Sequence, residues 1–165
     1  MPEKETLERA KQDKRQGKSP STQAGEFVRE EIHHIREGKH GARSPEQAIA
    51  IGLSKARRAG VELKPPEKGK TSPETRRSAA QALTRGRSRR KPSATRSRAI
   101  RTALKHEGRS AASEPLLAKH ARSAARRRTV SERSAAARKA ARTKGPRVRS
   151  AAARRAARTR ARSTT

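Results

Sequence analysis

The large apolar residues of this chain are concentrated in its first 70 positions, and the positive charge is concentrated after them. Residues 1–70 hold 11 of the 18 Ile, Leu, Val, Met and Phe residues and carry 16 Lys and Arg against 11 Asp and Glu, a net charge of +5. Residues 71–165 carry 29 Lys and Arg against four Glu, a net charge of +25. Because like charges repel and alanine buries little area, this second part cannot build a deep core.

This division predicts a mainly α fold, in which a small N-terminal helical hairpin precedes a long, largely disordered basic tail. The tail is rich in Ala and Arg, so we expect short helices that form there conditionally. The expected segments are a charged helix and linker (1–21), the helical hairpin (22–63), a Pro/Ser/Arg-rich linker (64–96), a degenerate second helical pair (97–128) and a tail of Arg-Ser-Ala-Ala repeats (129–165).

Two amphipathic patterns define the hairpin. Apolar residues from about 23 to 37 recur at helical spacing and form one stripe. The next helix is predicted to begin after Ser44 as N-cap, with Pro45 at its first position and Gln47 completing a capping box. Gly52 on this helix permits a close approach to its partner. Residues 3–17, with little apolar surface, predict an exposed and marginal helix.

The connector at 38–43 is basic and Gly-rich, and two interpretations of it stay open. It is either a phosphate-contacting turn at a helix N-terminus or an ordinary interhelix loop. The helix that follows ends in Lys55, Arg57 and Arg58, which favours contact with phosphates over the reading of bases.

The tail contains Arg-Ser-Ala-Ala five times, and the last two copies extend into an eleven-residue repeat. Residues 134–144 and 150–160 each predict a three-turn helix, with Ser134 or Ser150 as N-cap. On such a helix the cations gather within about 100° of one another. Like charges at this spacing oppose the helix in water, so we expect the tail to be disordered alone and to gain helix on nucleic acid.

The basic residues expected to contact nucleic acid lie in the hairpin, in the linker and along the tail. They are Lys39, Arg43, Lys55, Arg57, Arg58, Arg89, Arg90, Lys91, Arg126, Arg127, Arg128, Arg138, Lys139, Arg142, Arg154, Arg155 and Arg158.

Sequence patterns for catalysis or metal binding are weak. Glu30-x-x-His33 and Glu31-x-x-His34 match half of a di-iron carboxylate site, but no second copy is evident, so we interpret them as polar residues on an exposed helix face. No nucleophile elbow, Walker loop or dinucleotide fingerprint occurs, and cysteine is absent. We therefore expect no enzyme activity, no metal and no cofactor.

The partner class follows from charge and from the scarcity of aromatic rings. With Phe27 as the single aromatic residue, the chain lacks a platform on which unpaired bases could stack, so duplex DNA is the expected partner. An RNA- or ribosome-associated protein, or a protein-interaction hairpin with an electrostatic anchor tail, are the alternatives. No apolar run has the length of a membrane span, so we expect no membrane partner and a cytoplasmic, nucleoid-associated location. A homodimer through the hairpin is a further expectation.

Two resemblances extend this interpretation. The block GKHGARSPEQAIAIGLSKARRAG at 38–60, with QGKSPSTQAGEFVREEI before it, resembles an uncharacterised family of small basic bacterial proteins. The segments GRSAAS and RSAAARKAART resemble the tails of its longer members, and the family implies a bacterial source but no activity. The tail is also similar to linker-histone and bacterial histone-like tails, although it uses Arg where linker histones use mostly Lys. That second likeness implies a histone-like protein that binds DNA without reading its sequence.

Overall fold

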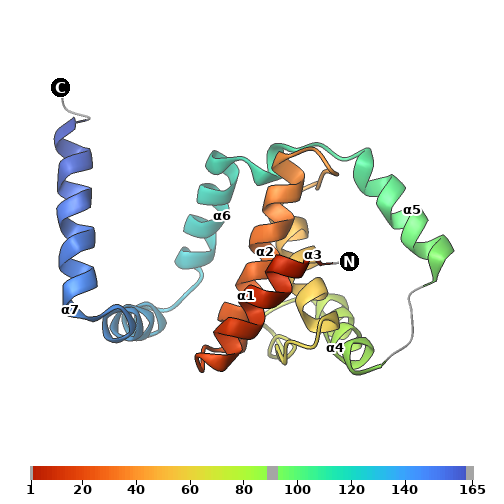
Figure 1. The fold of residues 1–165 in the computed structure, drawn as a ribbon, viewed down its shortest axis with the longest axis horizontal. Helices are drawn as coiled ribbons and strands as arrows, with labels where there is room; N and C mark the ends of the chain where they lie inside the picture. Colours follow the sequence, from red (N-terminus) through yellow and green to blue (C-terminus); the bar gives the residue numbers. More distant parts are fainter. Residues whose placement is uncertain (1, 89–92, 163–165) are drawn as a thin grey trace. The chain divides into compact units, whose positions relative to one another are not determined.

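The computed structural model describes residues 2–88 and 93–162, and it is mainly helical, as predicted (Figure 1). The elements are α1 (Lys4–Arg15), α2 (Pro20–Arg36), α3 (Pro45–Arg58), α4 (Pro73–Arg87), α5 (Ala94–Lys105), the short 3₁₀ helix η1 (Ser110–Ala112), α6 (Glu114–Arg126) and α7 (Val130–Arg162). The described residues contain no β-strand. The chain divides into two compact units, residues 1–120 and 121–165, and we describe each by itself.

Three of the helices begin at a Ser-Pro pair. Proline stands at the first position of α2, α3 and α4, where its missing N–H costs no hydrogen bond and its fixed φ suits the helix. The Oγ of Ser44 accepts from the backbone N–H of Gln47 at 3.3 Å, which confirms the predicted cap. The Oγ of Ser72 accepts from the N–H of Thr75 at 3.2 Å in the same way. The Ser19-Pro20 pair starts α2 three residues before residue 23, where we expected this helix to begin.

The centre of unit 1–120 is the predicted hairpin of α2 and α3, seen crossing closely in Figure 1. Phe27 is fully buried between the helices, together with Ala24 and Ala56. A Cβ placed on Gly52 would lie 2.7 Å from the Cα of Val28, so this glycine permits the close approach that the sequence predicts.

Helix α1 is not the exposed and marginal helix that we expected. Ala10 is buried in the same cluster as Phe27, and Leu7 packs against that cluster. The guanidinium Nε of Arg9 also lies 2.7 Å from a carboxylate oxygen of Glu26 on α2. Contacts with α2 thus supply the stability that a short charged helix lacks alone.

The segment predicted as a linker, 64–96, contains the packed helix α4. Ala79 and Ala82 are buried. A Cβ on Gly86 would fall 2.0 Å from the carbonyl oxygen of Arg57, which shows how closely α4 meets the end of α3. The starting signal was present in the sequence, because Ser-Pro-Glu occurs at Ser72 as it does at Ser44.

The segment 97–128 forms helices in both expected places, α5 and α6, but neither contains a buried residue. The buried part lies between them. Ala111 and Ala112 of η1 are almost inaccessible and form a second apolar cluster with Ile35, Ala42 and Ala48. This short turn therefore fills the space beside the connector of the hairpin.

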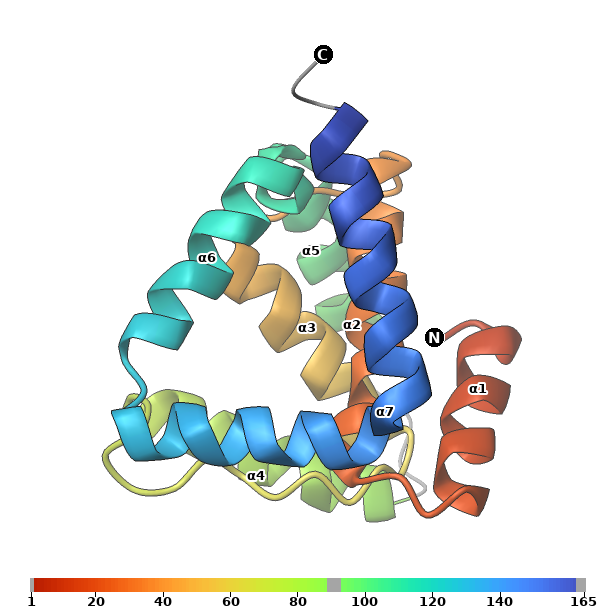
Figure 2. The same ribbon diagram turned by 90° about the vertical axis from the view of Figure 1, so that its left-hand side faces the viewer.

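The C-terminal segment is helical in the structure rather than largely disordered, which corrects our expectation. Alanine has the highest helix propensity, and a Thr129/Glu132 capping box starts α7. Ser134 and Ser150, predicted as N-caps, therefore lie inside helical segments. Gly145, with φ of 65°, interrupts α7 before Pro146, and Figure 2 shows the two segments meeting at a bend there. No described residue of α7 is buried.

Candidate functional site

Six of the predicted nucleic-acid ligands lie on α7 in two groups of three, one on each side of Gly145. They are Arg138, Lys139 and Arg142, followed by Arg154, Arg155 and Arg158. All six are exposed, and because they are helical, each group shares one side of its segment, as predicted. Among the described residues, no carboxylate forms an ion pair with any of the six. None of these six charges is therefore neutralised by a carboxylate of the described residues.

Arg126, Arg127 and Arg128 are also exposed, at the end of α6 and in the turn that precedes α7. The guanidinium of Arg133 donates to the backbone carbonyl oxygen of Arg128 at 3.0 Å. The side chain of Arg128 is not used in this hydrogen bond and lies at the surface. The predicted ligands Arg89, Arg90 and Lys91 lie outside the described residues.

The three cations predicted at the end of α3 have different surroundings. Arg58 is exposed, and its Nε donates to the carbonyl of Ser54. Arg57 is buried, and its Nε donates to the carbonyl of Leu63 at 3.0 Å. Burial lowers the pKa of Arg57. Lys55 has an 18% exposed side chain and faces two glutamates, so Arg57 and Lys55 stabilise the fold rather than presenting charge to a partner.

The connector of the hairpin is occupied by another part of the chain. The backbone N–H of Gly41 donates to the carbonyl of Leu104 at 2.8 Å, and that of Ala42 donates to Gly108 at 2.9 Å. A Cβ on Gly41 would lie 1.9 Å from the carbonyl oxygen of Glu107. These two amides are therefore not available to a phosphate, and the interpretation as an interhelix loop fits this connector better.

The side chains of the connector still contribute positive surface. Arg43 is 79% exposed and lies 3.6 Å from Glu107. Lys39 pairs with Glu37 at 3.0 Å and with Glu3 at 3.1 Å, and these contacts raise the pKa of Lys39. Lys39 also lines a hollow together with Lys105 and Arg109, which stand more than 60 positions after Lys39 in the sequence.

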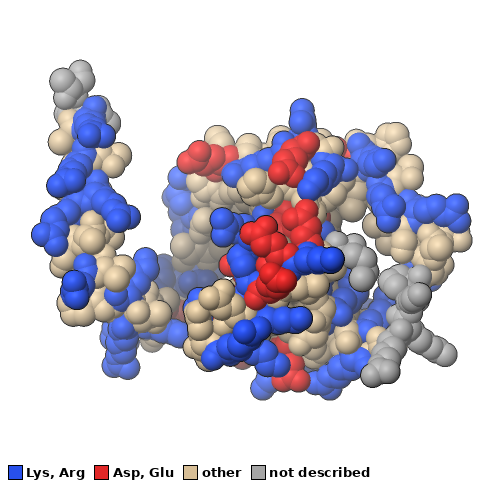
Figure 3. Space-filling model, in the orientation of Figure 1, with Lys and Arg blue, Asp and Glu red and all other residues tan. Residues whose placement is uncertain are grey.

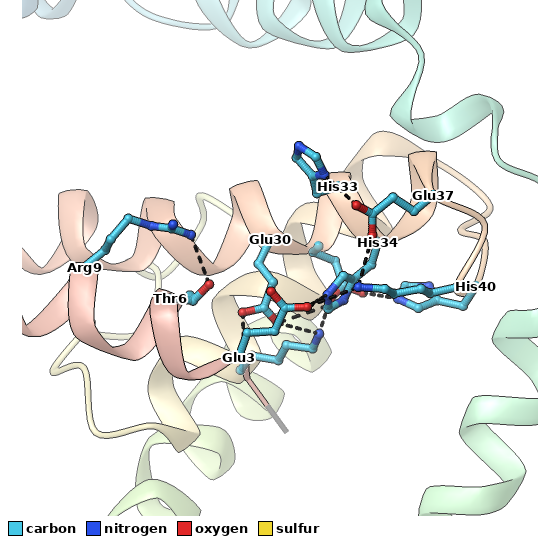
Figure 4. A network of polar contacts seen from close by, with 11 residues as sticks. Glu3, Thr6, Arg9, Glu30, His33, His34, Glu37 and His40 are labelled. Carbon is cyan, nitrogen blue, oxygen red and sulfur yellow. Dashed lines mark hydrogen bonds and ion pairs between the residues drawn. The ribbon is translucent and has the colours of Figure 1, made fainter.

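A buried polar network lies between α2 and α3, and Figure 4 shows it from close by. Glu31 has no solvent exposure and Glu30 almost none. The Nζ of Lys55 lies 2.5 Å from Oε2 of Glu31 and 3.5 Å from Oε1 of Glu30. Our interpretation of this region as an exposed helix face is wrong for Glu30, Glu31 and His34.

A spacing signal for this burial was present in the sequence. Glu31 stands four residues after Phe27 and four before Ile35, so it lies within the apolar stripe of α2. The sequence does not show that Lys55 and His40 come to the same place, because they belong to α3 and to the connector. Those two residues are the part of the site that sequence reasoning missed.

The start of α1 closes one side of this network. The Nε2 of His34 donates to Oε1 of Glu3 at 2.8 Å, and the Nζ of Lys39 donates to the same oxygen. These hydrogen bonds, that from His34 foremost, lower the pKa of Glu3 to about 2. The backbone N–H of Glu3 donates to Oε2 of Glu30 at 3.1 Å, so α1 is tied to α2 at this point.

His40 closes the other side. Its Nδ1 donates to the carbonyl of Gly41 at 3.1 Å, and its Nε2 lies 3.2 Å from Oε1 of Glu31. One nitrogen each from His34 and His40 and one oxygen of Glu31 all lie within 4.8 Å of one another. Side chains from α2 and the connector thus converge on one buried carboxylate.

Carboxylates also gather on the surface next to this network. Figure 3 shows red side chains together where α1 and α2 lie, within a surface that is otherwise blue and tan. Glu3, Glu5, Glu30 and Glu37 line a hollow here. Unit 1–120 therefore presents both signs of charge, whereas residues 121–165 hold 16 Lys and Arg against one Glu.

Comparison with protein-family models, with curated proteins and with solved structures gave no significant match. Of the helices in the described residues, none combines the length and the apolar composition that a membrane span requires.

Proposed function

We propose that this protein is a histone-like, nucleoid-associated protein that binds duplex DNA without reading its sequence. The observation that carries the proposal is the chain after His120, where 16 Lys and Arg stand against one Glu and the described part contains no buried residue. A helix that buries nothing contributes no core, while its cations can each neutralise a phosphate and release counterions.

The side chains between these cations support backbone binding over base reading. Most of the remaining positions in α7 are alanine, which adds neither hydrogen-bond donors for base edges nor rings for stacking. Arginine offers a planar fork that matches phosphate oxygens. We also propose that the chain belongs to the uncharacterised bacterial family that it resembles. The bacterial source that this implies agrees with a nucleoid location.

Binding to unrelated DNA duplexes at several salt concentrations tests this function. The logarithm of the binding constant should fall linearly with the logarithm of the salt concentration, with a slope near −0.9 for each phosphate contacted. Replacing the six predicted ligands on α7 (Arg138, Lys139, Arg142, Arg154, Arg155 and Arg158) with Gln should weaken binding and reduce that slope by up to about 0.9 per lost contact. The matched control changes each of the five arginines to Lys and Lys139 to Arg, which keeps the positive charge at all six positions.

Four outcomes would contradict the proposal. Binding that survives molar salt would show that phosphate neutralisation does not dominate. Binding confined to a single DNA sequence would show base reading. A Gln variant with wild-type affinity would remove α7 from the interface. Recovery of RNA in place of DNA after crosslinking in cells would favour the RNA-associated alternative.

A further inference from the structure

Glu31 is a buried carboxylate whose charge is not fully matched. It lies in the apolar stripe of α2 without solvent exposure, and neither of its oxygens accepts a hydrogen bond of normal geometry. Glu30 beside it is also buried, and Lys55 is the ammonium group that contacts both. Two buried carboxylates against one ammonium leave one negative charge in excess, which favours a further cation at this place.

The hydrogen bonds of the two histidines define which of their nitrogens face this charge. The Nδ1 of His40 carries a proton because a carbonyl oxygen can only accept, so in the neutral ring Nε2, which lies 3.2 Å from Oε1 of Glu31, holds a lone pair. A lone pair 3.2 Å from a carboxylate oxygen is repulsive, and either a second proton on the ring or a metal ion bound by both atoms removes that repulsion. In the same way, His34 donates from Nε2 to Glu3 and, in the neutral ring, keeps a lone pair on Nδ1, which lies 4.0 Å from Oε1 of Glu30.

We propose that Glu31, His34 and His40 form a binding site for a divalent transition-metal ion of the Zn²⁺ class, which clamps the connector of the hairpin to α2. Two imidazole nitrogens and one carboxylate oxygen are a ligand set that suits such ions. In a tetrahedral zinc site with bonds of about 2.0–2.1 Å, neighbouring ligand atoms lie about 3.4 Å apart. The separation of 3.2 Å between His40 Nε2 and Glu31 Oε1 is close to that spacing, and the three ligand atoms together lie within 4.8 Å of one another, so the His34 ring would move closer when an ion binds.

The surroundings also provide the outer contacts that metal sites use. A metal-binding histidine normally donates its second N–H to a carboxylate or a backbone carbonyl, and here the acceptors are Glu3 for His34 and Gly41 for His40. Lys55 holds the second oxygen of Glu31, which leaves Oε1 for the metal. His34 lines the hollow beside α1 and His40 lines the hollow beside the connector, so an ion can reach the site from the surface.

The test titrates Zn²⁺ into the untagged full-length chain after treatment with a chelator, with calorimetry to measure affinity and stoichiometry. We expect one Zn²⁺ per chain and a rise in melting temperature, because an ion that binds only the folded state stabilises it. His40→Gln and Glu31→Gln should abolish this binding. Glu3→Ala, which removes the acceptor of the His34 N–H but no proposed metal ligand, should weaken it by about 10- to 100-fold.

The matched control is His33→Gln, since His33 is adjacent to His34 but has a 66% exposed side chain and pairs with Glu37. This variant should bind Zn²⁺ as the wild type does. Co²⁺ added to the wild-type chain gives a measurement that needs no variant, because absorption bands of four- or five-coordinate Co²⁺ report the site directly. Absence of these bands, absence of stoichiometric Zn²⁺ binding, or equal losses in His33→Gln and His40→Gln would overturn the proposal.

Discussion

Single glycines set the distance between the central helices. Gly52 brings α3 against the backbone of α2 at Val28, and Gly86 brings α4 against the backbone of α3 at Arg57. Backbone atoms cannot move aside as a flexible side chain can, so any side chain at either position would separate two helices. Gly25 differs from both, because nothing lies within 4 Å of a Cβ built on it.

We expect Gly52→Ala to destabilise the protein by about 1–3 kcal/mol, because the added methyl group overpacks a closed interface. Gly25→Ala is the control and should stabilise by about 0.5–1 kcal/mol, because it lowers the entropy of the unfolded chain and favours the helix. Urea denaturation followed by circular dichroism measures both changes. Equal effects of the two substitutions would contradict the close approach of α2 and α3.

Buried charge is the other feature that individual residues decide. Arg57 stabilises the exit from α3 through the carbonyls of Leu63 and Lys64. Lys55 contacts Glu30 and Glu31 in the interior. From the sequence, Lys55 and Arg57 resemble the basic residues of the tail that we expect to contact phosphates. Only the structure distinguishes them from the exposed Arg58, because it places Lys55 beside α2 and Arg57 against the chain that follows α3.

Copies of the repeated tetrapeptide Arg-Ser-Ala-Ala differ in how deeply they are buried. Arg-Ser-Ala-Ala occurs five times, yet only in the copy that starts at Arg109 are both alanines buried. Those alanines form η1, and the Nε of Arg36 donates to the carbonyl of Ala112 at 2.9 Å. Both alanines of the copy that starts at Arg133 are exposed on α7. The repeat therefore supplies a small apolar turn in one unit and an exposed basic helix in the other.

Ala112→Leu should destabilise unit 1–120 by about 1–3 kcal/mol, because no space is free beside Ala42 and Ala48 for a larger side chain. Ala136→Leu makes the same change in an exposed copy of the repeat and should stay within about 0.5 kcal/mol of wild type. Thermal unfolding monitored by circular dichroism compares the two variants. An unchanged melting temperature for Ala112→Leu would show that η1 does not contribute to the core.

The two units of the molecule differ in what holds them together. Every residue in the described part that is buried belongs to residues 2–112, so the core lies within unit 1–120. The helices after Ala121 depend on alanine propensity, on the Thr129 capping box and on whatever neutralises their charge. The core and the nucleic-acid interface that we propose thus lie in different stretches of the chain.

A chain shortened to residues 1–120 should melt within a few degrees of the full-length protein, because the removed part buries no side chain. The same truncation should remove most of the affinity for duplex DNA and most of its salt dependence. Differential scanning calorimetry and fluorescence anisotropy measure the two effects on one preparation. A large drop in melting temperature would show that residues 121–165 support the core.

The sequence by itself determined the helical class, the Ser-Pro start of α3, the glycine contact at Gly52 and the separation of the basic tail from the apolar stripe. These features depend on residues within a turn or two of one another, where helix period, capping and charge act locally. The same local rules also predicted that the six predicted ligands on α7 share one face of each helical segment, and periodicity can reveal no more of the proposed interface.

Only the tertiary structure decided which polar residues lie inside. Arg36 meets Ala112 across 76 positions, Gly41 meets Leu104 and Lys55 meets Glu31, and no local period encodes such pairs. The histidine site needs α2 and the connector together, so it stayed hidden behind an interpretation based on one helix. Burial is a property of neighbours distant in sequence, and it turned Glu31, Lys55 and Arg57 from surface charges into parts of the interior.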